Sequence, residues 1–474
     1  MEERKTATAP SGGRSWGDAP QEDTLQTRDV KALLAGKIES GEPVALYCYG
    51  ILASHMLCCL EEFYGVLPAV IIDNDERKRG TAEFGVPVMP FADARERFGR
   101  LRYFICSDDF KYTIIGDLLE EGVRPEDIVN YVPVERRRTC LYFYNRLLLV
   151  QGREDGPHSI AHCNKDSFKP QTASTRFPCV DGRYEDVGQI LDRSFEEFER
   201  GEIECCRDCV MNKEQYIVSR GYPRHYKSVA FYQETCADCV SHCVYCCVEG
   251  GAKRSKPVSL RPLEDFSKFA ASVLALGRVD DDLTCAIDVS EREHGRKVGT
   301  ALKVLEEAGS TPLVYKINSC LLVYEEELAG LLRQGKVYVI WSLDAGTRET
   351  YRKIKQIDAF DKAVDNVRRY IEEDVFGGRF IVAKYLIVKG INDDPDEFDA
   401  YLRVVKGLGL RFVSLSFDYN VEADEQDLAF IRDCYRKLVR EGLQITYKND
   451  SAAVTKALSM NSILEQSIGQ GGTE

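Results

Sequence analysis

Three features that would point to a membrane or a nucleic-acid protein are missing from this sequence. No run of about 18 apolar residues occurs, so no transmembrane helix is expected. Basic residues do not predominate: 63 Lys and Arg stand against 77 Asp and Glu, and the net charge of −14 disfavours a nucleic-acid backbone as the main partner. The polar start of the chain lacks the apolar core of a signal peptide, which favours a cytoplasmic protein.

The chain of 474 residues is long enough for about three domains, and its pattern changes several times. We expect a disordered tail (1–25), a small α/β domain (26–139), a cysteine-rich connecting segment (140–222), a parallel α/β core (223–450) and a C-terminal tail (451–474).

The small domain alternates short apolar strands, at about 43–48, 69–73 and 102–106, with helical segments. Asp73 ends the second strand, where a dinucleotide fold would bind a ribose. The phosphate loop is poor, because Gly50 is one glycine where G-x-G-x-x-G needs three. The segment resembles the Rossmann-like domains in front of some sugar-modifying enzymes, and both nucleotide binding and a docking role remain open.

Cysteines are abundant, 18 in all, and ten of them lie between Cys163 and Cys247. The most informative run is Cys239-Val-Ser-His-Cys243-Val-Tyr-Cys246, a C-x3-C-x2-C pattern that occurs once. Three thiolates at this spacing can hold three irons of a [4Fe-4S] cluster and leave the fourth open for a small molecule. In a reducing cytosol, such clustered cysteines favour metal or cluster binding over disulfides.

The region from about 227 to 450 alternates regularly between strands and helices. Candidate strands are 228–233, 283–289, 312–318, 337–343, 380–388 and 412–417. Candidate helices are 263–276, 297–308, 325–334, 360–372, 395–408 and 424–441. Six such units predict a partial (β/α)6 parallel barrel, with chemistry at the carboxyl ends of its strands. The cysteine run directly follows the first strand, where that chemistry is expected.

This region resembles the core of radical S-adenosylmethionine (SAM) enzymes. The cysteine run carries the resemblance, and so do polar residues at five further strand ends. The resemblance implies that Cys239, Cys243 and Cys246 bind the cluster. It implies SAM contacts at Tyr245, Ser290, Glu291, Asn318, Ser342, Asp344, Gly390 and Ile391. Ser290 stands where the family has glycine, a departure in the turn expected to hold the methionine end of SAM.

The connecting segment carries a second group of cysteines, Cys163, Cys205, Cys206 and Cys209. A short helix running into Cys205 and Cys206 is similar to the SPASM-type segments that hold auxiliary clusters. Three alternatives stay open: a second Fe–S cluster, no metal, or zinc bound by two C-x2-C pairs that include Cys236.

The resemblance implies reductive cleavage of SAM to a 5′-deoxyadenosyl radical that abstracts hydrogen from a substrate. It also implies a reductant such as flavodoxin or ferredoxin. The front domain favours a nucleotide sugar or glycan precursor as substrate, whereas a SPASM-like segment favours a peptide. The alternative function is a non-catalytic scaffold that binds zinc or an Fe–S cluster and has a degenerate SAM site.

Overall fold

The structure is a computed structural model of the whole chain. It describes residues 29–107, 110–140, 147–152, 159–161, 176–178, 187–203, 212–219, 226–233, 241–245, 279–288, 299, 313–418, 421–447, 453–454 and 457–458.

The front domain is built on a five-stranded sheet in the order β3-β4-β2-β1-β5. Its strands are β1 (Val44–Tyr47), β2 (Val70–Ile72), β3 (Ala82–Glu83), β4 (Val86–Met89) and β5 (Arg102–Ile105). All neighbours pair in parallel except β3, which runs antiparallel to β4. Its helices are α1 (Val30–Glu39), α2 (Ile51–Tyr64), α3 (Phe91–Phe98) and α4 (Lys111–Glu120), with 3-10 turns at Glu76–Lys78 and Pro125–Asp127.

The sequence explains the main elements of this domain. Strands β1 and β2 are short apolar runs whose residues are almost all buried, as expected for the centre of a parallel sheet. Helix α1 starts where the Asp29 carboxylate accepts the Lys31 amide at 3.0 Å, and α2 ends at Gly65, whose φ of 65° suits glycine. The predicted strands of this domain are therefore confirmed.

The predicted ribose acid, Asp73, is engaged inside the domain. Its carboxylate accepts the backbone amide of Tyr49 at 2.8 Å and that of Asp75 at 2.9 Å. The ammonium group of Lys78 donates to the same carboxylate at 2.9 Å and to the Tyr49 carbonyl at 2.7 Å. These contacts tie the loop after β1 to the loop after β2.

The connecting segment contains more regular structure than we predicted. An antiparallel ribbon pairs β6 (Val134–Cys140) with β10 (Asn212–Val218), and α5 spans Val187–Glu199. Strand β7 (Leu147–Gly152) joins the large sheet in parallel with β11, followed by antiparallel β8 (Ser159–Ala161) and β9 (Arg176–Pro178). The apolar run that opens β7 is typical of a buried parallel strand, and the surrounding cysteines obscured it.

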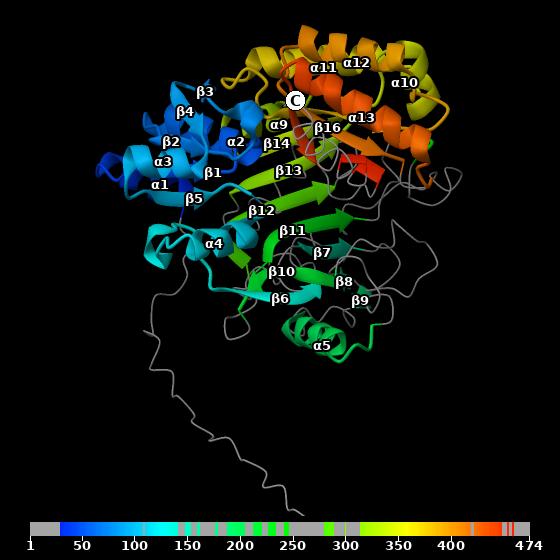
Figure 1. Cartoon of the computed structure of the whole chain (residues 1–474). Coiled ribbons are helices and arrows are strands. Elements are labelled where there is room, and N and C mark those ends of the chain that lie inside the picture. Colours follow the sequence, from blue (N-terminus) through cyan, green and yellow to red (C-terminus); the bar gives the residue numbers. More distant parts are fainter. Residues whose placement is uncertain are drawn as a thin grey trace, which may run out of the picture.

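The large sheet has ten strands in the order β17-β16-β15-β14-β13-β12-β11-β7-β8-β9 (Figure 1). The bounds are β11 (Tyr226–Gln233), β12 (Val279–Asp288), β13 (Val314–Ser319), β14 (Val337–Ser342), β15 (Ile381–Ile387), β16 (Phe412–Phe417) and β17 (Gln444–Tyr447). Neighbours from β7 through β17 are all parallel. The predicted α/β class with its parallel sheet is confirmed, and β7 and β17 extend the six predicted strands on both sides.

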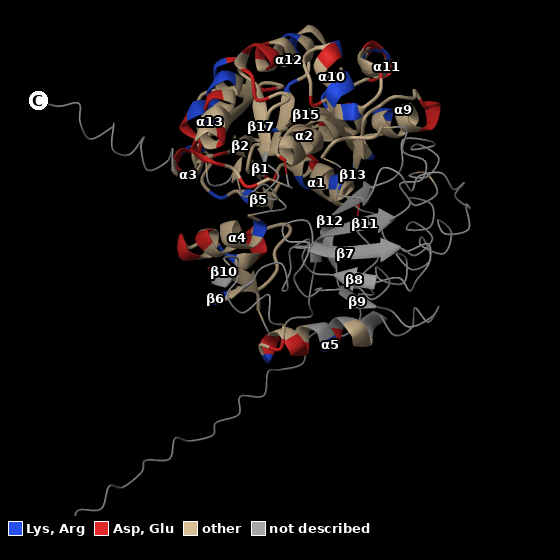
Figure 2. Cartoon of the chain, turned by 90° about the vertical axis from the view of Figure 1, so that its right-hand side faces the viewer, with Lys and Arg blue, Asp and Glu red and all other residues tan. Residues whose placement is uncertain are grey.

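Five described helices cover this sheet. They are α9 (Glu326–Arg333), α10 (Arg348–Lys355), α11 (Phe360–Glu373), α12 (Pro395–Gly407) and α13 (Glu425–Arg440). Lys, Arg, Asp and Glu are frequent along these helices with both signs mixed, as is typical of solvated helices (Figure 2). The helices predicted at 263–276 and 297–308 lie outside the described residues, apart from the single helical residue Gly299. Among the described residues, no helix is long and apolar enough to cross a membrane.

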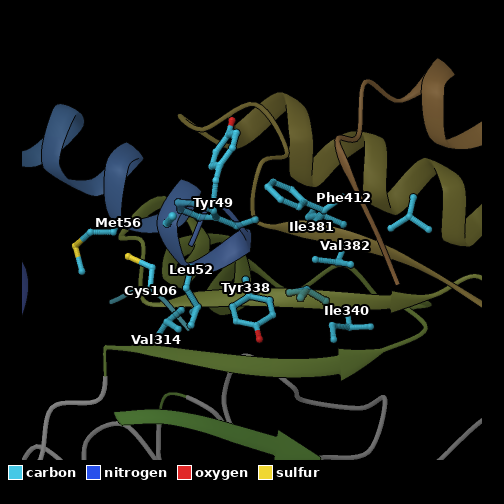
Figure 3. Close-up of a cluster of buried hydrophobic side chains, with 14 of the residues drawn as sticks. Tyr49, Leu52, Met56, Cys106, Val314, Tyr338, Ile340, Ile381, Val382 and Phe412 are labelled. Atoms are coloured by element: carbon cyan, nitrogen blue, oxygen red, sulfur yellow. The ribbon is translucent and has the colours of Figure 1, made fainter. Parts of the chain in front are cut away.

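The front domain packs against the amino ends of the large sheet's strands. Lys31 and His55 each contact the carbonyl of Gly335, just before β14, at 2.9 Å. The buried carboxylate of Glu83 pairs with Arg379 and Arg411, which precede β15 and β16. Figure 3 shows Leu52 and Met56 of α2 in one apolar cluster with Tyr338, Ile340 and Phe412 of the large sheet. This contact leaves the carboxyl ends of the strands on the opposite side.

Candidate functional site

The described part of the cysteine run, residues 241–245, is attached to the carboxyl end of α10. The backbone amide of His242 donates to the Lys355 carbonyl at 2.9 Å, and that of Val244 donates to the Ile354 carbonyl at 2.9 Å. The last carbonyls of a helix have no partner within the helix, so this loop supplies two donors that they need. The backbone on both sides of Cys243 is thereby held in place.

A buried triad of side chains adds a second attachment. The Tyr245 hydroxyl lies 2.6 Å from the Asp344 carboxylate, and the Lys355 ammonium donates to the same oxygen at 2.6 Å. Lys355 and the Tyr245 hydroxyl are 2.7 Å apart. The side chains of Lys355 and Asp344 are both 0% exposed. The triad (Tyr245, Asp344 and Lys355) therefore joins the cysteine run, the end of β14 and α10.

The backbone around Asp344 is specialised to place its carboxylate. Asp344 has φ of 57°, a left-handed conformation that non-glycine residues adopt infrequently. Its second carboxylate oxygen accepts the Leu386 amide at 2.9 Å. The side chain of Asn392 donates to the Asp344 carbonyl at 2.8 Å and accepts the Val388 amide at 2.6 Å. The loops after β14 and β15 are thus fixed to each other.

The electrostatics of the triad follow from burial and pairing. Burial alone would raise the pKa of Asp344, but the positive charges of Lys355 and Lys384 outweigh it, so the pKa is lowered. Burial alone would lower the pKa of Lys355, but Asp344 outweighs it and the pKa is raised well above its usual value. Asp344 and Lys355 are therefore an ion pair at neutral pH.

Cys243 lies beside the ion pair of Asp344 and Lys355. A hydrogen bond with Cys320, which follows β13, lowers its pKa to about 6; burial opposes the shift, and the positive charge of Lys355 assists it. The Ser241 hydroxyl donates a hydrogen bond to the sulfur of Cys320 at 3.7 Å. A thiol with this pKa is mostly thiolate at neutral pH, the form that binds metals. Cys243 has the donor chemistry that an iron–sulfur cluster requires.

The other described residues predicted to contact SAM lie around the same edge. Ser342 ends β14 and is buried, and Asn318 lies half-buried on neighbouring β13. Ile391 packs with Tyr245 against a small apolar cluster of Ile354, Leu386 and Val388. Gly390 has φ of 76° and its amide donates to Asp393 at 2.9 Å. Cys243, Tyr245 and Asp344 are brought together with Ile391, while contact of any of these residues with SAM stays a prediction.

Eight predicted site residues lie outside the described residues. They are Cys163, Cys205, Cys206, Cys209, Cys239, Cys246, Ser290 and Glu291. Within the described part of the chain, no group of three or more His, Cys, Asp or Glu side chains is arranged to hold a metal ion. The second cluster and the complete cysteine triad therefore stay predictions.

Sequence reasoning missed the role of three residues: Lys355, Lys384 and Asn392. Lys355 carries no local signal, because its partners lie 11 and 110 residues away. Lys384 carried a local signal, since it is the one charged residue in the otherwise apolar or aromatic strand β15. A lysine in a fully buried strand is rarely placed there for packing.

Comparisons with known proteins give low similarity. Neither a protein-family model nor a curated protein matches the chain. A radical SAM methyltransferase from Sphaerobacter thermophilus aligns at 16% identity over 44% of this chain and 63% of its own, with a TM-score of 0.35. A domain of pyruvate-formate lyase-activating enzyme from Bacteroides vulgatus aligns at 13% identity over 34% and 98%, with a TM-score of 0.28.

A dihydropteroate synthase from Xanthomonas albilineans aligns at 13% identity over 59% of this chain and 89% of its own, also with a TM-score of 0.28. TM-scores this low are found both for radical SAM enzymes and for a dihydropteroate synthase, so they do not distinguish between these enzymes. The case for a function therefore rests on the residues at the carboxyl edge of the sheet.

Proposed function

We propose that this chain is a radical SAM enzyme whose cluster is bound by Cys239, Cys243 and Cys246. The observation that carries the proposal is the position of Cys243. Its loop is attached to α10 and to Asp344 at the carboxyl edge of a parallel sheet, and its thiol pKa is about 6. Parallel α/β sheets carry their chemistry at this edge.

The chain's own residues have distinct parts in this proposal. Tyr245 and Lys355 hold the loop, and the thiolate of Cys243 faces Cys320. Ile391 and the Tyr245 ring provide an apolar surface beside the loop, suited to the flat adenine of SAM. Ser342 and Asn318 offer hydrogen-bonding groups on adjacent strands of the same sheet.

When bound, the cluster supplies the electron that cleaves SAM into methionine and a hydrogen-abstracting 5′-deoxyadenosyl radical. The protein's contribution is orientation and exclusion of water at the buried triad. The substrate class proposed from the sequence is a small molecule, such as a nucleotide sugar, or a peptide. A flavodoxin or ferredoxin is the proposed reductant.

The test uses the full chain, purified and reconstituted without oxygen. Iron, sulfide and zinc are counted, and 5′-deoxyadenosine is measured after dithionite and SAM are added. We expect about four irons per chain from the cysteine run and about eight if the auxiliary site is also filled. Zinc without iron would contradict the proposal and favour a scaffold.

Two cysteine variants sharpen this test. Cys243→Ala should lose the cluster and SAM cleavage together. Cys48→Ala is the matched control, because Cys48 is another partly exposed cysteine, located in the front domain. A full cluster in Cys243→Ala would mean that the assigned ligand is wrong.

A further inference from the structure

The inner face of the large sheet carries a row of polar side chains. On β15, Tyr385 packs against Tyr401 and Phe398 of α12, with ring centroids 4.7 and 5.0 Å apart. Because side chains alternate along a strand, Lys384 faces the opposite way. Its ammonium lies 5.2 Å from the centre of the Tyr245 ring, which confirms that direction.

The register of the sheet extends this row to three neighbouring strands. Lys384 pairs directly with Ser342 of β14 on one side and with Ser414 of β16 on the other. Ser416 pairs with Leu386, one step closer to the carboxyl edge. Directly paired residues of parallel strands point to the same face. The four side chains form a polar row (Ser342, Lys384, Ser414 and Ser416) in the interior beside the cysteine run.

Three members of this polar row have no hydrogen-bond partner among the described residues. The buried hydroxyls of Ser414 and Ser416 make no hydrogen bond within the described part of the chain, and both residues are 0% exposed. Lys384 is 8% exposed, and among the described residues its ammonium has a ring contact but no hydrogen-bond acceptor. Buried polar groups are nearly always hydrogen-bonded, and an unpaired buried charge is costlier still. Three such groups side by side indicate that a ligand supplies the missing acceptor.

The unpartnered donors define the ligand. Lys355 and Asp344 neutralise each other in the triad, so Lys384 is the ammonium that is left without a hydrogen-bond acceptor among the described residues. One ammonium flanked by hydroxyl donors matches a singly charged oxyanion whose lone pairs accept from all of them. A carboxylate has that charge and those acceptors, whereas a phosphate monoester brings nearly two negative charges.

We propose that Lys384, with Ser414 and Ser416, forms a binding subsite for the carboxylate of the enzyme's substrate. This subsite proposal depends on the proposed function in one respect only: the proposed function places the reaction beside the cysteine run. Lys384 lies three residues before the end of β15, or about 10 Å deeper than the strand end. The predicted SAM contacts Gly390 and Ile391 lie beyond that end, whereas Ser342, another predicted SAM contact, pairs directly with Lys384, so the second test below decides between the substrate and the methionine carboxylate of SAM.

The first test uses acetate as a probe and needs no cluster. Unfolding of the full chain is followed in sodium acetate and in sodium chloride at equal ionic strength. Acetate should stabilise the wild type, because a ligand that binds only the folded state shifts the unfolding midpoint. Lys384→Met should weaken acetate binding about tenfold or more, and Ser414→Ala should weaken it less. Lys389→Met is the matched control, since Lys389 follows the same strand but pairs with Asp424 and Asp427.

The second test separates the two sources of carboxylate. Binding of SAM, and of the SAM analogue that lacks the carboxylate, is measured with reconstituted wild type and Lys384→Met. Equal affinities of SAM for both proteins, together with the acetate effect, support the substrate subsite. A tenfold loss for SAM alone would assign Lys384 to the cofactor and overturn the proposal. Acetate that stabilises wild type and Lys384→Met equally would also overturn it, whether or not the wild type cleaves SAM.

Discussion

The two parallel sheets of this molecule each place an acidic residue just beyond a central strand: Asp73 in the front domain and Asp344 in the large sheet. Both carboxylates accept a backbone amide and a lysine ammonium. The surroundings differ. Lys78, the partner of Asp73, is 30% exposed, while Lys355 is fully buried and a second lysine, Lys384, lies nearby.

This difference indicates which edge is prepared for a ligand. At the front domain, the acid that could hold a ribose already joins two loops of the protein. At the large sheet, the acid is also engaged, but Lys384, Ser414 and Ser416 have hydrogen-bonding groups that no described residue satisfies. An apparent binding residue is thus informative only after its existing partners have been counted.

The largest effect is expected where the buried ion pair is broken. Lys355→Met should destabilise the fold by about 3–5 kcal/mol, because Asp344 would stay charged in the interior without its ion-pair partner. Asp73→Asn should cost less, since Lys78 remains accessible to water. Urea unfolding of both variants measures the two losses in the free energy of unfolding, which can then be compared. The double variant Asp344→Asn with Lys355→Met should recover part of the loss, and strictly additive effects would refute the coupling.

Residue separation explains why the sequence predicted the sheets better than these contacts. The central strands are unbroken apolar runs, and such runs specify a buried parallel strand locally. The Asp344–Tyr245 contact spans 99 residues, and Arg411 reaches Glu83 across 328. Nothing in the local pattern encodes those pairs. Likewise, Asp73 was correctly placed at a strand end, but its partners could only be seen in three dimensions.

The second prediction concerns the pH dependence of stability that is caused by His55, a buried polar residue of the front domain. Burial lowers the pKa of His55 well below its usual value near 6.5. The folded chain therefore stays neutral at His55 while the unfolded chain takes up a proton, so stability is complete above about pH 6.5 and falls below it. The expected loss from this residue is about 1.4 kcal/mol per pH unit. Unfolding from pH 7 to pH 5 measures it, and His55→Gln should reduce the slope.

A third substitution should change the stability of the fold by a smaller amount and should increase it. Ser414→Ala removes a buried hydroxyl that has no hydrogen-bond partner among the described residues, so the ligand-free protein should become more stable by up to about 1 kcal/mol. Thermal unfolding without added carboxylate measures this change. A clear loss of stability would show that the hydroxyl already has a structural partner, and would remove one support of the proposed subsite.

The smallest effect concerns nucleotides at the front domain. Because Asp73 already accepts Tyr49 and Lys78, NADH or UDP-glucose should leave the thermal midpoint unchanged within error. Equilibrium dialysis with either nucleotide gives an independent reading. Saturable binding that Asp73→Asn abolishes would contradict this prediction. It would mean that the front domain, and not only the large sheet, has an edge prepared for a ligand, and it would favour nucleotide binding by this domain.

The apolar contact between α2 and the amino ends of the strands has a consequence for how the molecule unfolds. Buried residues from Val30 to Ala457 belong to one continuous cluster, so the front domain and the large sheet share a core (Figure 3). Elements joined in this way open together as one cooperative unit. Calorimetry of the intact chain should show them melting in a single transition. A fragment that begins after the front domain would expose that core to water and aggregate, so biochemical work requires both parts in one polypeptide.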